Sequence, residues 1–224
     1  MCDDFDTKIL ISSPRGEMVV EQLDKLGIVS RKNIDPAELR SCFLHSYVED
    51  GIYLSGLLPE NCIAVNMSEQ YRYYFLSHQR QRADITYEGT LYENFPLPRL
   101  VFGFQFDTKE QRVRKCKLCV VPEGVLTSNT KLYYYPFSNV GTEGSICLGN
   151  NPLPVYKRSE QLTTLPGFIL SLPNNNHQFM EKHNKPHLQY RDLLEHMKDK
   201  PSAYYYEHIL IENGQTLGQF LEWR

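Results

Sequence analysis

The sequence lacks the features of membrane, secreted and nucleic-acid-binding proteins. No apolar run approaches the roughly 20 residues of a membrane-spanning helix, and the acidic start MCDDFD lacks the basic residues and long apolar core of a secretory signal. Basic residues are not in excess, because 24 lysines and arginines stand against 27 aspartates and glutamates. We therefore expect a cytoplasmic protein that binds neither membrane nor nucleic acid.

The chain also lacks the cysteine spacing of a disulfide or zinc framework. It has six cysteines, and cytoplasmic thiols are kept reduced. Cys116 and Cys119 form a Cys-x-x-Cys pair in KCKLC, but the surrounding alternation is typical of a strand, which puts the two side chains on opposite faces. No second Cys/His pair with ligand spacing accompanies them. We expect no metal site and no cofactor.

Apolar periodicity predicts a mixed α+β chain. Residues 7–23 form two apolar segments around SPRG and predict a β-hairpin. Residues 36–49 are predicted to form a helix, because Asp35 is placed as its N-cap and apolar residues recur at helical spacing. Strands are then expected over residues 62–121, and they predict an antiparallel meander: CIAVNM, YRYYFLS, ADITYEGTLY, RLVFGFQF and RVRKCKLCVV, with FDTKEQ as the last turn.

After residue 122 the pattern becomes irregular. Residues 122–154 are rich in Gly, Pro, Asn, Ser and Thr and contain one short apolar element, KLYYY. Two helical segments follow, SEQLTTLPGFILSL, which Pro166 and Gly167 are expected to interrupt, and PHLQYRDLLEHMKDK. AYYYEHILI is predicted as a closing strand, followed by a turn at Asn213–Gly214 and a short helix or strand. Because long irregular segments in compact domains are usually functional, the functional residues are expected in 122–154.

This irregular segment contains YPFSNVGTEGSICLGN, in which Cys147 lies eight positions after Asn139. A cysteine thiolate is a nucleophile, and an amide N–H can stabilise charge that develops on a carbonyl oxygen. Gly141 and Gly144 permit a positive φ, by which the chain could turn back and bring Asn139 close to Cys147. Taken singly, Asn139 is equally explained as a turn residue. For an isolated cysteine such as Cys147, a small buried residue is the commoner case.

FSNVGTEGSICLGN resembles the active-site segment of ubiquitin-conjugating enzymes. In that family a His-Pro-Asn tripeptide is followed, across a glycine-containing turn, by G-x-I-C-L with the catalytic cysteine eight residues after the asparagine. Asn139 and Cys147 keep this spacing, whereas Phe137 and Ser138 stand where the family has His and Pro. The wider chain is similar to a bacterial branch of that fold, the PRTRC system protein B family, in LLPENCIAV, YEGTLYENFPLPRLVF, PFSNV, GSICLG and FILSLPNNNHQF.

The resemblance implies an α+β fold of the ubiquitin-conjugating type, an antiparallel meander with flanking helices. Residues 58–224 would be the catalytic domain, and residues 1–57 would be an N-terminal hairpin and helix extension.

The same resemblance implies a transferase that carries an activated ubiquitin-like protein as a thioester on Cys147 and passes it to an amine. Asn139 would be the second catalytic residue, and Gly144 and Ser145 would position the substrate. His177, in the later segment PNNNHQF, is a third candidate for positioning the substrate, because it could lie near the site and assist an incoming nucleophile. The implied partners are the ubiquitin-like protein and an adenylating enzyme of the ThiF type. Related bacterial systems occur in plasmid-like and antiphage gene clusters, which implies a role in plasmid maintenance or antiphage defence.

Two other functions stay open at this point. Because the His-Pro of the motif is missing, the chain could be a non-catalytic module that binds a ubiquitin-like tail. Because His177 and His183 follow in PNNNHQFMEKH, it could be a cysteine hydrolase of ubiquitin-like conjugates, in which a histidine makes the thiolate of Cys147. That segment is polar, so solvated histidines are the simpler interpretation.

Overall fold

The structure is a computed structural model, and it describes residues 6–12, 17–24, 27–35, 37, 57–68, 70–78, 82–156 and 158–223. By its internal contacts the chain divides into two compact units, residues 1–55 and 56–224. None of the helices in the described ranges is long and apolar enough to cross a bilayer.

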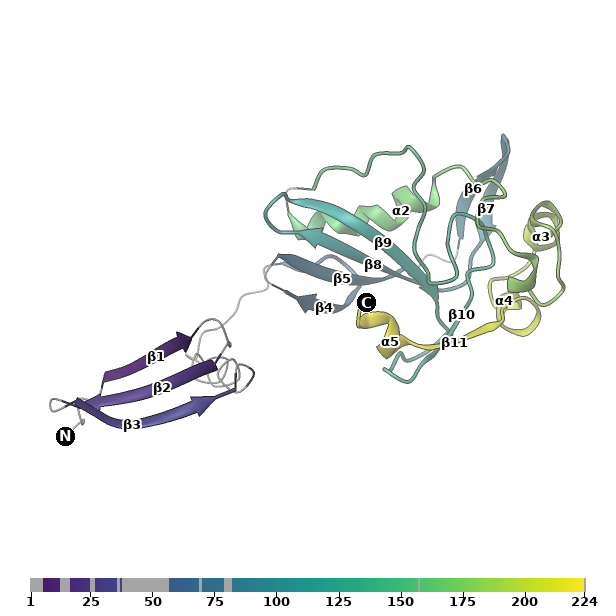
Figure 1. Ribbon diagram of the computed structural model, residues 1–224. Coiled ribbons are helices and arrows are strands. Elements are labelled where there is room, and N and C mark those ends of the chain that lie inside the picture. The colour runs from purple at the N-terminus through teal and green to yellow at the C-terminus, as the bar shows by residue number, and fades with distance from the viewer. Residues whose placement is uncertain are drawn as a thin grey trace. The chain divides into compact units, whose positions relative to one another are not determined.

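The first unit contains a three-stranded antiparallel sheet in the order β1-β2-β3 (Figure 1), formed by β1 (Asp6–Ser12), β2 (Glu17–Asp24) and β3 (Gly27–Ile34). The hairpin predicted over residues 7–23 is confirmed by the antiparallel pairing of β1 with β2. The sequence did not predict β3, which pairs with β2 and sets Arg31 opposite Glu21 in a 2.7 Å ion pair. Of the helix predicted over residues 36–49 the structure describes only Ala37, which is helical and whose N–H donates to the side chain of the predicted N-cap, Asp35 (2.7 Å). The other residues of this helix lie outside the described residues.

The second unit is built on a six-stranded antiparallel sheet in the order β11-β10-β9-β8-β5-β4 (Figure 1). Its strands are β4 (Cys62–Met67), β5 (Tyr71–His78), β8 (Leu100–Asp107), β9 (Arg112–Val120), β10 (Lys131–Tyr133) and β11 (Glu212–Thr216). The sheet therefore confirms the predicted antiparallel pairing of β4, β5, β8 and β9.

ADITYEGTLY was predicted as one strand of this meander, and that prediction was wrong. The segment is a hairpin of its own, β6 (Arg82–Tyr87) and β7 (Thr90–Pro96), inserted between β5 and β8. The reason is local: Glu88 and Gly89 both have a positive φ, 45° and 81°, and two such residues make the tight turn of a two-residue hairpin.

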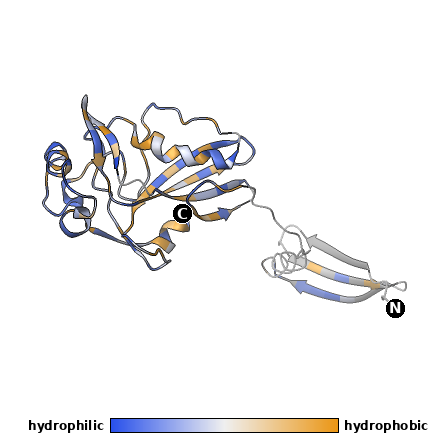
Figure 2. Cartoon of the chain, turned by 180° about the vertical axis from the view of Figure 1, so that it is seen from behind, coloured by the Kyte–Doolittle hydropathy of each residue, from blue (hydrophilic) through white to orange (hydrophobic). Residues whose placement is uncertain are grey.

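Side chains along the central strands alternate between two faces of this sheet. Cys116 and Leu118 of β9 enter the larger core, with residues from the β6–β7 hairpin and from the helices α2 (Leu165–Leu170), α3 (Tyr190–Met197) and α4 (Tyr204–His208). Cys119 enters the smaller core on the other face, which α5 (Leu217–Leu221) covers with Leu217 and Phe220. The prediction that Cys116 and Cys119 lie on opposite faces is confirmed. Figure 2 shows α5, near the C-terminus, coloured largely as hydrophobic, which fits this burial.

The helices described in the second unit are short, and all of them follow the irregular segment of residues 122–154. They are η1 (Ser159–Thr164), α2 (Leu165–Leu170), η2 (Glu181–His183), α3 (Tyr190–Met197), α4 (Tyr204–His208) and α5 (Leu217–Leu221). The segment that Pro166 and Gly167 were expected to interrupt divides just before them, into η1 and α2. Pro166 lies in the first turn of α2, where a backbone N–H would have no partner within the helix.

The predicted closing strand at AYYYEHILI is also wrong, because residues 204–208 form α4. Tyr205 and Ile209 are one helical turn apart and both fully buried, so packing overrides the β-propensity of the tyrosines. The closing strand is β11 instead, and Asn213–Gly214 lies inside it rather than in a connecting turn. β11 pairs with β10 through an irregular register.

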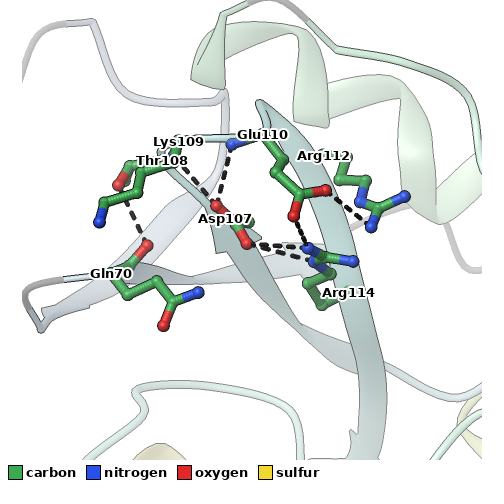
Figure 3. A network of polar contacts seen from close by, with 7 residues as sticks. All are labelled: Gln70, Asp107, Thr108, Lys109, Glu110, Arg112 and Arg114. Atoms are coloured by element: carbon green, nitrogen blue, oxygen red, sulfur yellow. Dashed lines mark hydrogen bonds and ion pairs between the residues drawn. The ribbon is translucent and has the colours of Figure 1, made fainter.

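Asp107 fixes the predicted polar turn between β8 and β9 (Figure 3). Its fully buried carboxylate accepts hydrogen bonds from the backbone N–H groups of Lys109 and Glu110, both at 3.0 Å, and from the Arg114 guanidinium at 3.1 and 3.2 Å. The backbone N–H of Glu110, with Arg114 and Lys109, holds the pKa of Asp107 below its ordinary value. These hydrogen bonds offset the cost of burying the charged carboxylate of Asp107, and they hold the turn of the β8–β9 hairpin closed.

Candidate functional site

The loop after β10 docks its residues 144–146 onto the edge of β9. The N–H of Leu118 donates to the carbonyl of Gly144 (2.8 Å), and the N–H of Ile146 donates to the carbonyl of Cys116 (3.0 Å). Lys117 and Ser145 lie between them as an antiparallel bridge. The loop thus continues the sheet where β10 ends, and Cys147 follows directly after the docked residues.

The chain also folds back on itself between Asn139 and Cys147. The Cys147 N–H donates to the Asn139 carbonyl (2.8 Å), Val140 bridges Ile146, and the Gly144 N–H closes the turn on the Gly141 carbonyl (2.8 Å). This small hairpin brings together two residues that lie eight positions apart in the sequence.

The two glycines act differently in this turn. Gly144 has a φ of +79°, and a Cβ there would lie 2.5 Å from the Leu118 carbonyl oxygen, so only glycine allows the close approach to β9. Gly141 was also expected to permit a positive φ, but it is not among the glycines that have one. The left-handed residue at that end of the turn is Asn139 itself, with a φ of +64°, a conformation that asparagine tolerates better than most residues.

Asn139 is held by a second irregular segment, residues 173–177. Its side-chain Nδ2 donates to the Pro173 carbonyl (3.1 Å), and its backbone N–H donates to the His177 carbonyl (3.0 Å). Because a primary amide has two N–H donors, one remains beside the bond to Pro173. Asn139 therefore anchors the loop, and the second N–H of its side-chain amide remains able to donate a hydrogen bond.

Asn139, Cys147 and His177 line one open groove of about 310 Å³. The other lining residues are Leu148, Gly149, Asn151, Leu172, Pro173 and Asn175. The described residues that line it include no aspartate or glutamate. His177 is exposed, and its backbone N–H donates to the side chain of Asn175 (2.6 Å). The groove could accept an extended, uncharged peptide segment next to the thiol.

The other described cysteines are poorer candidates for a nucleophile. Burial raises the pKa of Cys116 to about 12 and also raises the pKa of Cys119 and of Cys62. Cys147 is half-buried and lines the groove. Cys2 and Cys42 lie outside the described residues.

Three further residues singled out in the sequence lie elsewhere. Gly144 and Ser145 do not line the groove; Ser145 faces a separate depression of about 520 Å³ beside Lys117 and Trp223. The expectation of a solvated histidine is wrong for His183, which is buried and stacked on Tyr134 with ring centroids 4.1 Å apart, and burial lowers its pKa.

Among the described residues, no group of three or more His, Cys, Asp or Glu side chains could hold a metal ion.

The sequence singled out His177, which does line the groove, but it did not predict that residues 173–177 hold Asn139. The signal was present as the tract PNNNH, because three consecutive asparagines are typical of backbone-bonded turns. What the sequence could not show is that this turn lies against Asn139.

Comparison with protein families identifies the family of this chain. No curated protein and no solved structure matches the chain. The model of prokaryotic E2 family D matches residues 41–212, which include the whole irregular segment, strands β4 to β10 and the helices up to α4. The antiparallel sheet with few, short helices agrees with an E2-like fold, and the chain belongs to prokaryotic E2 family D.

Proposed function

We propose that this protein carries an activated ubiquitin-like protein as a thioester on Cys147 and transfers it to an amine. Family membership suggests ubiquitin-conjugating-like, transferase-type activity and implies two partners, a ubiquitin-like protein and its activating enzyme. The observation that carries the proposal further is the groove, which sets a half-buried thiol beside Asn139, a residue with a spare amide donor.

The proposed chemistry has two steps. In the first, the Cys147 thiolate attacks the activated C-terminal carbonyl of the ubiquitin-like protein, and the C–S bond forms as the activating enzyme's leaving group departs. In the second, an amine attacks the thioester, the C–N bond forms, and the C–S bond breaks to restore the thiolate. The N–H of Asn139 would stabilise the oxyanion of the intermediate, and His177 would take the proton of the amine.

A cysteine hydrolase receives less support from the same residues. His183 stacks on Tyr134 and does not line the groove. His177 does line it, but among the described residues no Asp, Glu or Asn side chain bonds to its ring as a catalytic triad requires, and Asn175 bonds only to its backbone N–H. We infer further that the activating partner is of the ThiF type and that the chain is closest to the PRTRC system protein B family, both from the sequence resemblance. That resemblance also favours a role in plasmid maintenance or antiphage defence.

The test is adduct formation with the ubiquitin-like protein, its activating enzyme and ATP. Wild-type protein should form an adduct that a thiol reductant cleaves. Cys147→Ser should form a slower, reductant-resistant oxyester, and Cys147→Ala should form none. Cys62→Ala is the matched control, because Cys62 is also half-buried but does not line the groove, and it should load normally.

An adduct that persists in Cys147→Ala would place the chemistry on another residue. If an active loading partner gives no adduct with the wild type, the chain is instead a binding module for the ubiquitin-like tail.

A further inference from the structure

Ser138 lies immediately before Asn139 and is almost completely buried, with 1% of its surface exposed. Its hydroxyl donates a 2.9 Å hydrogen bond to Oδ1 of Asn174. A buried hydroxyl needs such a partner, because an unpaired one would be costly to desolvate. The bond therefore ties the residue before Asn139 to the 173–177 segment.

Asn174 is itself fixed to the β6–β7 hairpin. Its backbone N–H donates to the Thr86 carbonyl (2.7 Å), and its carbonyl accepts from the Glu88 N–H (3.3 Å). Nearby, the Tyr87 hydroxyl donates to the side chain of Asn176 (2.9 Å). The segment that holds Ser138 is thus fixed to the end of β6 by an isolated parallel bridge between Tyr87 and Asn174.

The same segment meets Asn139 at two more points, the Pro173 and His177 carbonyls. Asn139 has a φ of +64°, which is a strained conformation for a residue other than glycine. Strained backbone persists only where its surroundings fix it. Without a proline ring, residue 138 does not fix its own φ, so the hydrogen bond to Asn174 has to restrict the turn.

We propose that Ser138 and Asn174 are positioning residues, whose hydrogen bond holds the Asn139 turn and, through the bond from the Cys147 N–H to the Asn139 carbonyl, the backbone of the nucleophile. Neither residue acts on the substrate itself. Ser138 serves this site as an internal tether between the active-site loop and the β6–β7 hairpin. This inference rests on the proposed function of Cys147.

The first test is the rate at which a preformed thioester discharges to free amine in single-turnover conditions. Ser138→Ala and Asn174→Ala should each slow discharge about 10-fold. This is the change in rate expected if the free energy of one hydrogen bond is lost from the transition state. If the two act through their mutual bond, the double variant should also be slowed about 10-fold. Independent effects would multiply to about 100-fold and would overturn the tether.

Two control variants separate positioning from general destabilisation. Ser138→Thr keeps the hydroxyl and should retain most of the discharge rate. Ser68→Ala removes another serine hydroxyl bond, to the Tyr71 carbonyl in the β4–β5 turn, and should discharge at the wild-type rate.

Hydrogen exchange tests the tether without any partner protein. The Cys147 N–H should exchange faster in Ser138→Ala than in wild type, and Ser68→Ala should not change it. Unchanged exchange, or normal discharge by Ser138→Ala, would overturn this inference alone. A wild-type protein that forms no thioester with active partners would overturn the proposed function and, with it, the catalytic role of the tether.

Discussion

Replacing Asn139 with glycine should separate its two roles, charge stabilisation and loop anchoring. Both Asn139→Gly and Asn139→Ala lose the 3.1 Å bond from Nδ2 to the Pro173 carbonyl, which contributes about 0.5–1.5 kcal/mol. Glycine adopts the φ of +64° without strain, whereas alanine adds roughly 1–2 kcal/mol. The free energy of unfolding should therefore fall by about 1 kcal/mol for glycine and by about 2–3 kcal/mol for alanine.

The kinetic effect should not follow this order of stability. If the second N–H of Asn139 contacts the oxyanion, both variants lose it equally. Discharge of a preformed thioester to free amine should then slow by about 10²- to 10³-fold in each. The measurement is single-turnover discharge at saturating amine, with unfolding followed in denaturant for the same proteins.

Asn151→Ala is the matched control for this experiment. Asn151 lines the same groove, and its Nδ2 donates to the nearby Leu148 carbonyl (2.9 Å). This variant should discharge within a few-fold of the wild-type rate. If Asn139→Gly discharges as fast as the wild type while its stability falls, the amide is only an anchor and the oxyanion role is refuted.

Three further outcomes follow from the structure. Gly144→Ala should lower the free energy of unfolding by about 1–3 kcal/mol in denaturant titrations, because its φ of +79° and the Leu118 carbonyl oppose a Cβ; equal stability would contradict the docking on β9. Since the native pKa of Asp107 is lowered, its contribution to stability is present above its ordinary value of 3.8 and is lost as pH falls through the native pKa. The gap in melting temperature between wild type and Asp107→Asn should thus narrow below about pH 4, and a constant gap would refute the ionised network. We also predict that a chain beginning at residue 56 unfolds cooperatively by calorimetry, because the two units are separately compact; aggregation would show that the first unit completes the core.

Much of the sheet could be predicted because its strands carry their signal locally. β4 begins and ends where CIAVNM does, and β5, β8 and β9 lie within one residue of the predicted segments. Their alternation is regular enough that the spacing of Cys116 and Cys119 alone assigns them to opposite faces, as the two cores confirm.

The errors arose where a tertiary contact outweighed a local preference. Tyrosine favours strands, yet Tyr205 lies in a helix, because its ring and Ile209 fill the core one turn apart. Its hydroxyl also donates to the Pro96 carbonyl, a partner 109 residues away in the chain. An Asn-Gly pair favours a hairpin turn, yet Asn213–Gly214 lies inside β11, whose pairing with β10 is irregular there.

The candidate site was found only in part for the same reason. The motif located Asn139 and Cys147, because their spacing is a local property of the chain. The residues that hold Asn139 are 34 or more positions further on, and nothing in the spacing of FSNVGTEGSICLGN predicts them. Such non-local contacts depend on the whole fold.

The position of the loop on β9 also explains why Cys147 opens onto the groove while Cys116, which lies close by, is buried. The N–H of Ile146 bonds to the carbonyl of Cys116, so the residue before Cys147 pairs directly with another cysteine. Yet the side chain of Cys116 points into the larger core, where burial raises its pKa to about 12 and leaves almost no thiolate at neutral pH. Cys147 lies beyond the paired residues, where the chain has turned back to Asn139 and opens onto the groove. The reactivity of a thiol in this sheet therefore depends on the face toward which it points and on whether it lies within the paired residues or beyond their end.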